Sequence, residues 1–147
     1  MIVSVDSRLE SVPLVEHLVR TFCESAGATV AESRQIEVCV AEAMNNCVIH
    51  SYKLCPGNTV ELRVCKTGSS LVLEIFDHGF QMDPKELLRS EAHLLDCGAR
   101  ALHELPEGGR GLCIIQSFMD TVQYTSLKKT NCLRMTRRVS GPVEDKK

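Results

Sequence analysis

The sequence carries almost no net charge, and this absence argues against a protein that binds polyanions. Its 147 residues include 17 lysines and arginines against 19 acidic residues, for a formal charge of −2. The basic residues are scattered, apart from short pairs such as those at 128–129 and 137–138. Binding to a polyanion needs clustered positive charge, so we expect no direct contact with nucleic acid.

Long apolar runs are also missing. No segment approaches the length that crosses a bilayer, so we expect no membrane span. The opening residues MIVSVDSRLE lack the basic stretch followed by an apolar stretch that marks a secretory signal. Apolar residues make up 44% and charged residues 24%, as in ordinary globular chains. We therefore expect a soluble cytoplasmic protein.

No C-x-x-C pair occurs among the eight cysteines, and no tight cluster of cysteine and histidine is present. Most of the cysteines lie among apolar neighbours, as in IEVCVAEA and GLCII. We interpret them as small buried side chains in a reducing compartment. A zinc site or a disulfide framework is the alternative.

Hydrophobic periodicity predicts the secondary structure. Helical spacing covers 11–26, with Ser11 as its cap and Gly27 at its end, and continues over about 30–52. The segment 84–107 predicts a short helix followed by a mobile stretch.

Strict alternation predicts strands over 59–66, 70–77, 121–127 and 131–139, and MIVSV predicts a short opening strand. Tight turns join these strands in pairs, so the sheet should be mixed or mainly antiparallel, with helices on one face. The prediction is an α+β fold, a two-layer α/β sandwich.

Polar side chains in AEAMNNCVIH form the first candidate site. Glu42, Asn46 and His50 are spaced by four, so they share one helical stripe at the border of the apolar face. A carboxylate there can accept a proton, and an amide oxygen can ligate Mg²⁺. A plain polar helix edge is the alternative, and we interpret His50 as hydrogen-bonding near the helix end.

The sequence DHGF is the second candidate. Asp77 ends a predicted strand, where a carboxylate can accept a hydrogen bond from an exocyclic amine. Gly79 lets a flat ring approach the backbone. An ordinary Asp-x-Gly turn is the alternative.

The third candidate is EGGRGLCII, in which Gly108, Gly109 and Gly111 precede a short apolar helix over 112–120. Unhindered backbone N–H groups at a helix start bind phosphate oxygens. The segment is neither a Walker A loop nor a Rossmann fingerprint, and a flexible hinge is the alternative.

Taken in this order, VAEAMNNCVIHSY, DHGF and EGGRGLCIIQSFMD resemble the N, G1 and G2 boxes of the histidine-kinase-like (GHKL) ATPases. Within that superfamily the chain resembles the anti-sigma-factor serine/threonine kinases of the RsbW/SpoIIAB type. The resemblance covers 1–139 as a single ATP-binding domain and leaves 140–147 as a polar tail. It implies the Bergerat fold, with ATP between the helices and the sheet.

The resemblance also implies roles for the polar helix stripe and for the adenine site. Asn46 would ligate Mg²⁺, and Glu42 would be the general base that takes the proton of the attacking hydroxyl. Asp77 would receive the adenine amino group, and Gly79 would lie against the ring.

For the glycine-rich segment, the resemblance implies that Gly109 and Gly111 cradle phosphates and that Arg110 neutralises the terminal phosphate. Two departures stand out. The G1 box has Gln81 where the D-x-G-x-G pattern has a second glycine, and the segment 85–107 is longer and more apolar than expected. That segment is a helix over the nucleotide or a docking surface.

The function that the resemblance implies is phosphorylation, with Mg–ATP, of a serine or threonine on an anti-anti-sigma (STAS-type) partner. Such a protein also sequesters a sigma factor, and family members are often homodimers. The alternative is a module that binds ATP or ADP and switches partners without catalysis.

Overall fold

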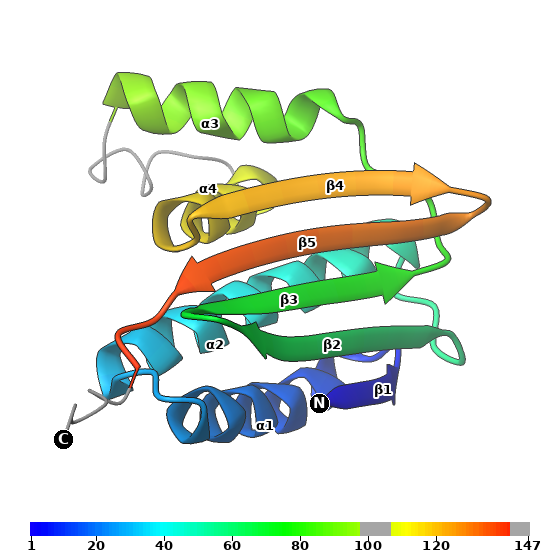
Figure 1. Cartoon of the computed structure of the whole chain (residues 1–147). Helices are drawn as coiled ribbons and strands as arrows, with labels where there is room; N and C mark the ends of the chain where they lie inside the picture. Colours follow the sequence, from blue (N-terminus) through cyan, green and yellow to red (C-terminus); the bar gives the residue numbers. More distant parts are fainter. Residues whose placement is uncertain (98–106, 142–147) are drawn as a thin grey trace, which may run out of the picture.

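Alternating apolar and polar residues form the strands that the sequence predicts. β2 (Thr59–Thr67) and β3 (Ser70–Asp77) make one hairpin, and β4 (Thr121–Leu127) and β5 (Thr130–Arg138) make a second. β1 (Ile2–Asp6) pairs with β2, and β5 joins the two hairpins by pairing with β3. The strand order is β1-β2-β3-β5-β4 (Figure 1).

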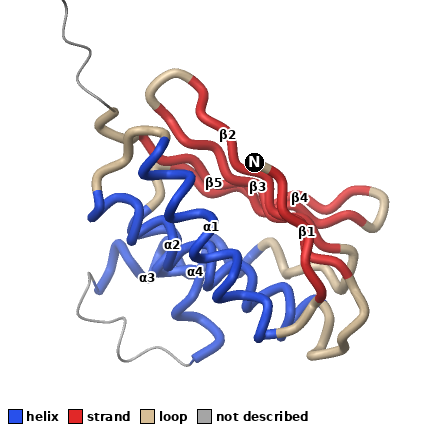
Figure 2. Tube along the Cα trace, turned by 90° about the horizontal axis from the view of Figure 1, so that it is seen from below, coloured by secondary structure: helices blue, strands red, loops and turns tan. Residues whose placement is uncertain are grey.

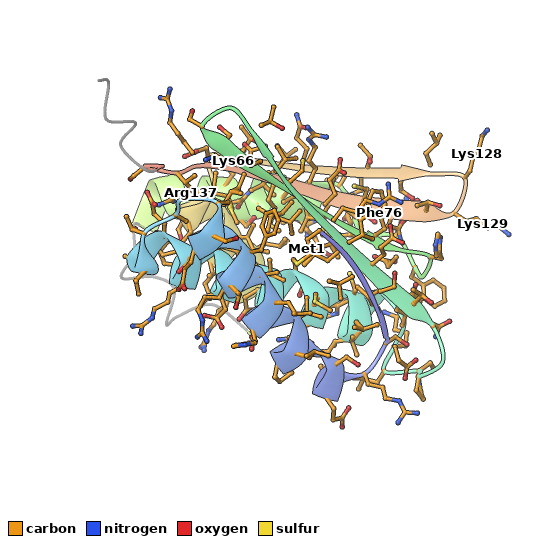
Figure 3. All side chains as sticks on the ribbon, turned by 60° about the horizontal axis from the view of Figure 1, so that its bottom comes forward. Met1, Lys66, Phe76, Lys128, Lys129 and Arg137 are labelled. Carbon is orange, nitrogen blue, oxygen red and sulfur yellow. The ribbon has the colours of Figure 1, made fainter. Side chains whose placement is uncertain are left out.

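The computed structural model describes residues 1–97 and 107–141. Within these ranges every strand pairing is antiparallel. The sequence predicted a mixed or a mainly antiparallel sheet, and the structure has the second kind. The β4–β5 turn holds Lys128 and Lys129 at φ 50° and 63°, the left-handed conformation of a tight two-residue hairpin turn. Both lysines extend into solvent from the hairpin tip (Figure 3).

The two faces of the sheet differ because side chains alternate along each strand. Leu73 and Ile75 on β3 and Met135 on β5 are buried against the helices. On the opposite face, the guanidinium of Arg134 lies 2.8 Å from a carboxylate oxygen of Glu74. Figure 2 shows the helices gathered on one face of the sheet. The α+β two-layer sandwich is therefore confirmed.

The first predicted helix is α1 (Val12–Ser25), and Gly27 with φ 99° ends it as expected. The prediction that Ser11 caps this helix is wrong. Ser11 belongs to a preceding 3₁₀ turn, η1 (Leu9–Ser11), with a helical φ of −76°, and its side chain makes no capping hydrogen bond. An N-cap side chain reaches the helix start from extended backbone, which Ser11 lacks.

The second helix begins with a capping box and ends in a π-helix. Thr29 precedes α2 (Val30–Asn46), where its hydroxyl accepts from the Glu32 amide and the Glu32 carboxylate accepts from the Thr29 amide. The chain then continues as η2 (Cys47–Ser51), a π-helical turn. Together α2 and η2 cover the predicted helix over 30–52. Such π-turns often occur at functional sites.

The segment after β3 contains α3 (Lys85–Cys97) and, after 98–106, α4 (Glu107–Phe118). The predicted mobile stretch lies outside the described residues. The prediction that the last helix starts after the glycines is wrong, because α4 already begins at Glu107. Packing of α4 against α2 overrides the weak helix propensity of glycine. Among the described residues, no helix is long and apolar enough to cross a bilayer.

The cysteines follow the prediction in part. Seven have described side chains, and each of these is a free thiol. Four are buried as expected, namely Cys23, Cys39, Cys47 and Cys113. Cys55 and Cys65 are exposed, and Cys132 is intermediate. In the part of the chain that the structure describes, no group of three or more metal-ligating side chains is present.

One buried hydroxyl links the end of α2 to the turn after β3. The Tyr52 side chain is 8% exposed. Its hydroxyl donates to the Thr59 carbonyl at 2.7 Å and accepts from the His78 amide at 2.8 Å. The tyrosine thereby fixes the turn that follows Asp77.

Replacing Tyr52 by phenylalanine tests this link. Tyr52→Phe removes two hydrogen bonds that are only partly buried, so we expect the free energy of unfolding to fall by about 0.5–1.5 kcal/mol. Urea denaturation followed by circular dichroism measures this change. An unchanged midpoint would mean that water replaces the hydroxyl at no cost.

Candidate functional site

A cavity of about 610 Å³ opens between the sheet and the helices. Its walls come from α2 and η2, from the inner side of β3, β4 and β5, and from α3 and α4. Of the predicted site residues, Asn46, Asp77 and Gly109 line it. The other predicted residues are not part of its lining, namely Glu42, Gly79, Arg110 and Gly111.

Asp77 is the buried charge at one end of the cavity, with 4% of its surface exposed. Its Oδ1 accepts from the Gly79 amide at 2.9 Å and from the Asn131 side-chain amide at 2.7 Å. Its Oδ2 accepts two longer hydrogen bonds, from the Ser51 hydroxyl at 3.3 Å and the Cys47 thiol at 3.4 Å. A buried carboxylate needs such donors to stay charged.

Asn131 is a site residue that the sequence reasoning missed. It lies directly opposite Asp77 in the β3–β5 register, and only 1% of its surface is exposed. The available signal was its position on the inward side of an alternating strand, two residues before the buried Leu133. A polar side chain on an apolar face needs a partner, which is Asp77.

Gly79 is required by a close approach inside the chain. A Cβ built on it would lie 2.2 Å from the carbonyl oxygen of Ser51. The Phe80 amide donates to the same oxygen at 2.8 Å. The turn after β3 is therefore held against η2, and Gly79 lines a neighbouring hollow instead of the main cavity.

Gly111 brings the first and third motifs together. A Cβ built on it would lie 2.8 Å from Glu42 Oε2 and 3.6 Å from Asn46 Nδ2. The start of α4 therefore packs directly on the polar stripe of α2. Gly109 has open space around its Cβ position and faces the cavity, whereas Arg110 is half-buried.

The remaining walls combine apolar surface with a few polar groups. Ile75, Leu133 and Tyr124 present apolar surface to the cavity, and the Tyr124 hydroxyl accepts from the Met82 amide at 2.9 Å. Burial raises the pKa of Tyr124 above its ordinary value, so this hydroxyl stays neutral. Such a wall suits a flat apolar ring.

Cys47 adds a neutral donor beside the carboxylate. Burial raises the pKa of the Cys47 thiol well above its ordinary value, and the negative charge of Asp77 is the second largest cause of this rise. The group therefore remains a thiol and donates to Asp77 at neutral pH.

Helix α3 supplies side chains that the sequence reasoning did not single out. Glu86 and Arg89 line the cavity, and the Arg89 guanidinium lies 3.5 Å from Asp83. His50, predicted as a local hydrogen-bonding residue, is an exposed part of the cavity wall. The cavity thus has the buried acceptor Asp77 at one end. Elsewhere its wall carries the Asn46 amide, the Arg89 guanidinium and the glycine-rich start of α4.

These residues could hold a metal ion only together with an anionic ligand. Asn46 offers one amide oxygen, and Mg²⁺ commonly takes one or two protein oxygens together with phosphate oxygens and water. The chemistry that the walls support is therefore binding of a ligand with a flat amine-bearing ring and an anionic chain.

Comparisons with known proteins identify the family of the chain. The family described as histidine kinase-like ATPase domain matches residues 5–137. An anti-sigma F factor of Anoxybacillus flavithermus is 31% identical over 108 residues, which cover 74% of this chain and 70% of that protein. A serine-protein kinase RsbW of Halalkalibacterium halodurans is 29% identical over 120 residues, which cover 82% and 72%.

Among solved structures, the SiaB–SiaC complex from Pseudomonas aeruginosa contains a similar chain. Its TM-score is 0.67 at 15% identity, with 92% of this chain and 88% of that chain covered. A likeness at this identity concerns the fold alone. With the family match over most of its length and the three motifs gathered around one cavity, the chain belongs to the histidine kinase-like ATPase domain family.

Proposed function

We propose that the chain binds Mg–ATP in the 610 Å³ cavity and phosphorylates a serine or threonine of a partner protein. The observation that carries the proposal is the contact of Gly111 with Glu42 and Asn46. This contact brings the candidate base Glu42, the candidate metal ligand Asn46 and the start of α4 together. The buried acceptor Asp77 lies at one end of the adjacent cavity.

Adenine occupies the Asp77 end in this proposal. The carboxylate accepts the exocyclic amine. The Gly79 amide donates to this carboxylate, so the turn that η2 holds orients Asp77 toward the ring. The apolar surface of Ile75, Leu133 and Tyr124 contacts the ring faces.

The phosphates extend toward Asn46 and the start of α4. Gly108 and Gly109 lie in the first turn of α4, where backbone N–H groups point out of the helix start and can donate to phosphate oxygens. Gly111 follows two residues later and lets α4 pack closely on α2. Arg110 neutralises the terminal phosphate. Asn46 would hold Mg²⁺, which would supply further positive charge to the phosphate chain.

In the transfer step, Glu42 takes the proton from the hydroxyl of the acceptor serine or threonine. The hydroxyl oxygen forms a bond to the γ-phosphorus, and the bond from that phosphorus to the β–γ bridging oxygen breaks. The products are a phosphorylated partner and ADP. Positioning and charge neutralisation supply most of the rate in such reactions.

The names of the relatives support a regulatory partner. One is an anti-sigma F factor and another is a serine-protein kinase. We infer that the substrate is a STAS-type anti-anti-sigma protein and that a sigma factor is the regulated partner. We also infer that the protein acts in the cytoplasm as a homodimer.

A module that binds nucleotide without transferring phosphate is the second candidate. One observation favours it: Glu42, the candidate base, does not line the cavity.

Replacing the candidate base separates the two functions. Glu42→Gln keeps the shape of the side chain against Gly111 but cannot take a proton, so we expect transfer to fall by about 10²- to 10⁴-fold. Affinity for Mg–ATP should stay within a factor of about two to three, because the group acts only on the acceptor. Labelled ATP with a STAS-domain partner measures transfer, and calorimetry measures affinity.

Glu37→Gln, on the same helix and paired with Arg20, is the matched control and should leave transfer unchanged. Normal transfer by Glu42→Gln would remove the carboxylate from the mechanism. No transfer by the unchanged protein with a verified partner would leave the binding module.

Replacing the candidate metal ligand tests the nucleotide site. Asn46→Ala removes the amide oxygen, so we expect affinity for ATP in the presence of Mg²⁺ to fall by about tenfold or more. Affinity measured with EDTA should change much less, since no metal ion is then present. Equal losses in both conditions would contradict the ligand role.

A further inference from the structure

We propose that Arg137 is a positioning residue, which holds α4 on α2 so that the start of α4 reaches the phosphate chain of the nucleotide. Arg137 is not part of the cavity lining, so it acts only through these two helices. This inference rests on the proposed function, since it requires phosphates between Asn46 and the start of α4.

Arg137 lies where the sheet meets both helices (Figure 3). It follows the buried Leu133 and Met135 on β5 at two-residue spacing, so its side chain points to the helical layer. One nitrogen of its guanidinium donates to the Phe118 carbonyl at the end of α4. The other donates to Gln35 Oε1 on α2 at 2.9 Å. A single side chain thus joins β5, α4 and α2.

The charge of Arg137 is balanced by the end of a helix. Among the described residues, no carboxylate forms an ion pair with it. Phe118 is the last residue of α4, where carbonyl groups lack partners within the helix and carry partial negative charge. A planar guanidinium can donate to this carbonyl and to the Gln35 amide oxygen at the same time, because its donors form a rigid fork.

Arg137 and Gly111 hold the same pair of helices at two separate places. Gly111 lies against Glu42 at the first place. Phe118 comes seven residues after Gly111, and Gln35 comes seven residues before Glu42, so the two helices run antiparallel. The second place is therefore about two turns, or roughly 10 Å, from the first. One contact leaves a helix free to tilt, whereas two contacts fix its direction.

The phosphate end of the cavity depends on that direction. Asn46 on α2 and Gly109 on α4 both line the cavity, so a tilt of α4 moves one relative to the other. Hydrogen bonds weaken steeply when a donor moves out of line with its acceptor. The buried acceptor Asp77 is instead held by η2, the turn after β3 and β5. Loss of Arg137 should therefore weaken binding of the phosphates and spare binding of the base.

Affinities for ATP and AMP, measured by calorimetry with Mg²⁺, test the inference, because the two nucleotides differ only in the β- and γ-phosphates. We expect the unchanged protein to prefer ATP. Arg137→Gln removes the fork, so it should weaken ATP about tenfold, as expected for one lost hydrogen bond to a charged group. It should weaken AMP by less than about twofold. A purely structural role would lower the free energy of unfolding but leave the ratio of the two affinities unchanged.

Gln35→Ala provides a second, milder variant. It removes the contact of Arg137 with α2 but keeps the hydrogen bond to the Phe118 carbonyl. The ratio of ATP to AMP affinity should fall in the same direction by a smaller factor. This variant carries the test if circular dichroism shows that Arg137→Gln does not fold.

Arg134→Gln is the matched control, because Arg134 lies on the same strand but pairs with Glu74 on the opposite face of the sheet. Its affinity ratio should equal that of the unchanged protein. If Arg137→Gln and Gln35→Ala also keep that ratio, Arg137 has only a structural role and the inference is overturned. If the unchanged protein binds neither nucleotide, the proposed function itself fails.

Discussion

The site depends on one buried carboxylate. Asp77 lies at the end of β3 with almost no exposure, where an ionised group without partners would be very costly. Its donors come from three places that are distant in sequence: η2, the turn after β3, and β5. The need to satisfy this charge therefore fixes how the helical layer meets the sheet at the cavity.

Much of the fold follows from sequence periodicity. The strands β2 and β3 alternate strictly, and the predicted bounds agree with the structure to within one residue. Helix ends were harder to predict, because they depend on local backbone conformation. Ser11 has the right residue type for a cap but lies in a 3₁₀ turn, whereas Thr29 has extended backbone and forms the capping box.

The candidate site was predictable as a set of residue types, and its distances were not. The polar stripe, the Asp-x-Gly turn and the glycines are visible in the sequence. Two close contacts depend on how remote segments pack: that of Gly79 with Ser51 and that of Gly111 with Glu42. Asn131 escaped notice because a single polar residue in a strand becomes informative only when its register partner, Asp77, is known.

The register of β3 against β5 also has a consequence for folding. Asp77 and Asn131 are 54 residues apart, so their bond can form only after the β4–β5 hairpin docks on β3. Pairings this distant close late, because the chain must first lose the entropy of a long loop. The pocket is therefore complete only after this docking, and a ligand that binds it would favour the folded chain over partly assembled forms by mass action.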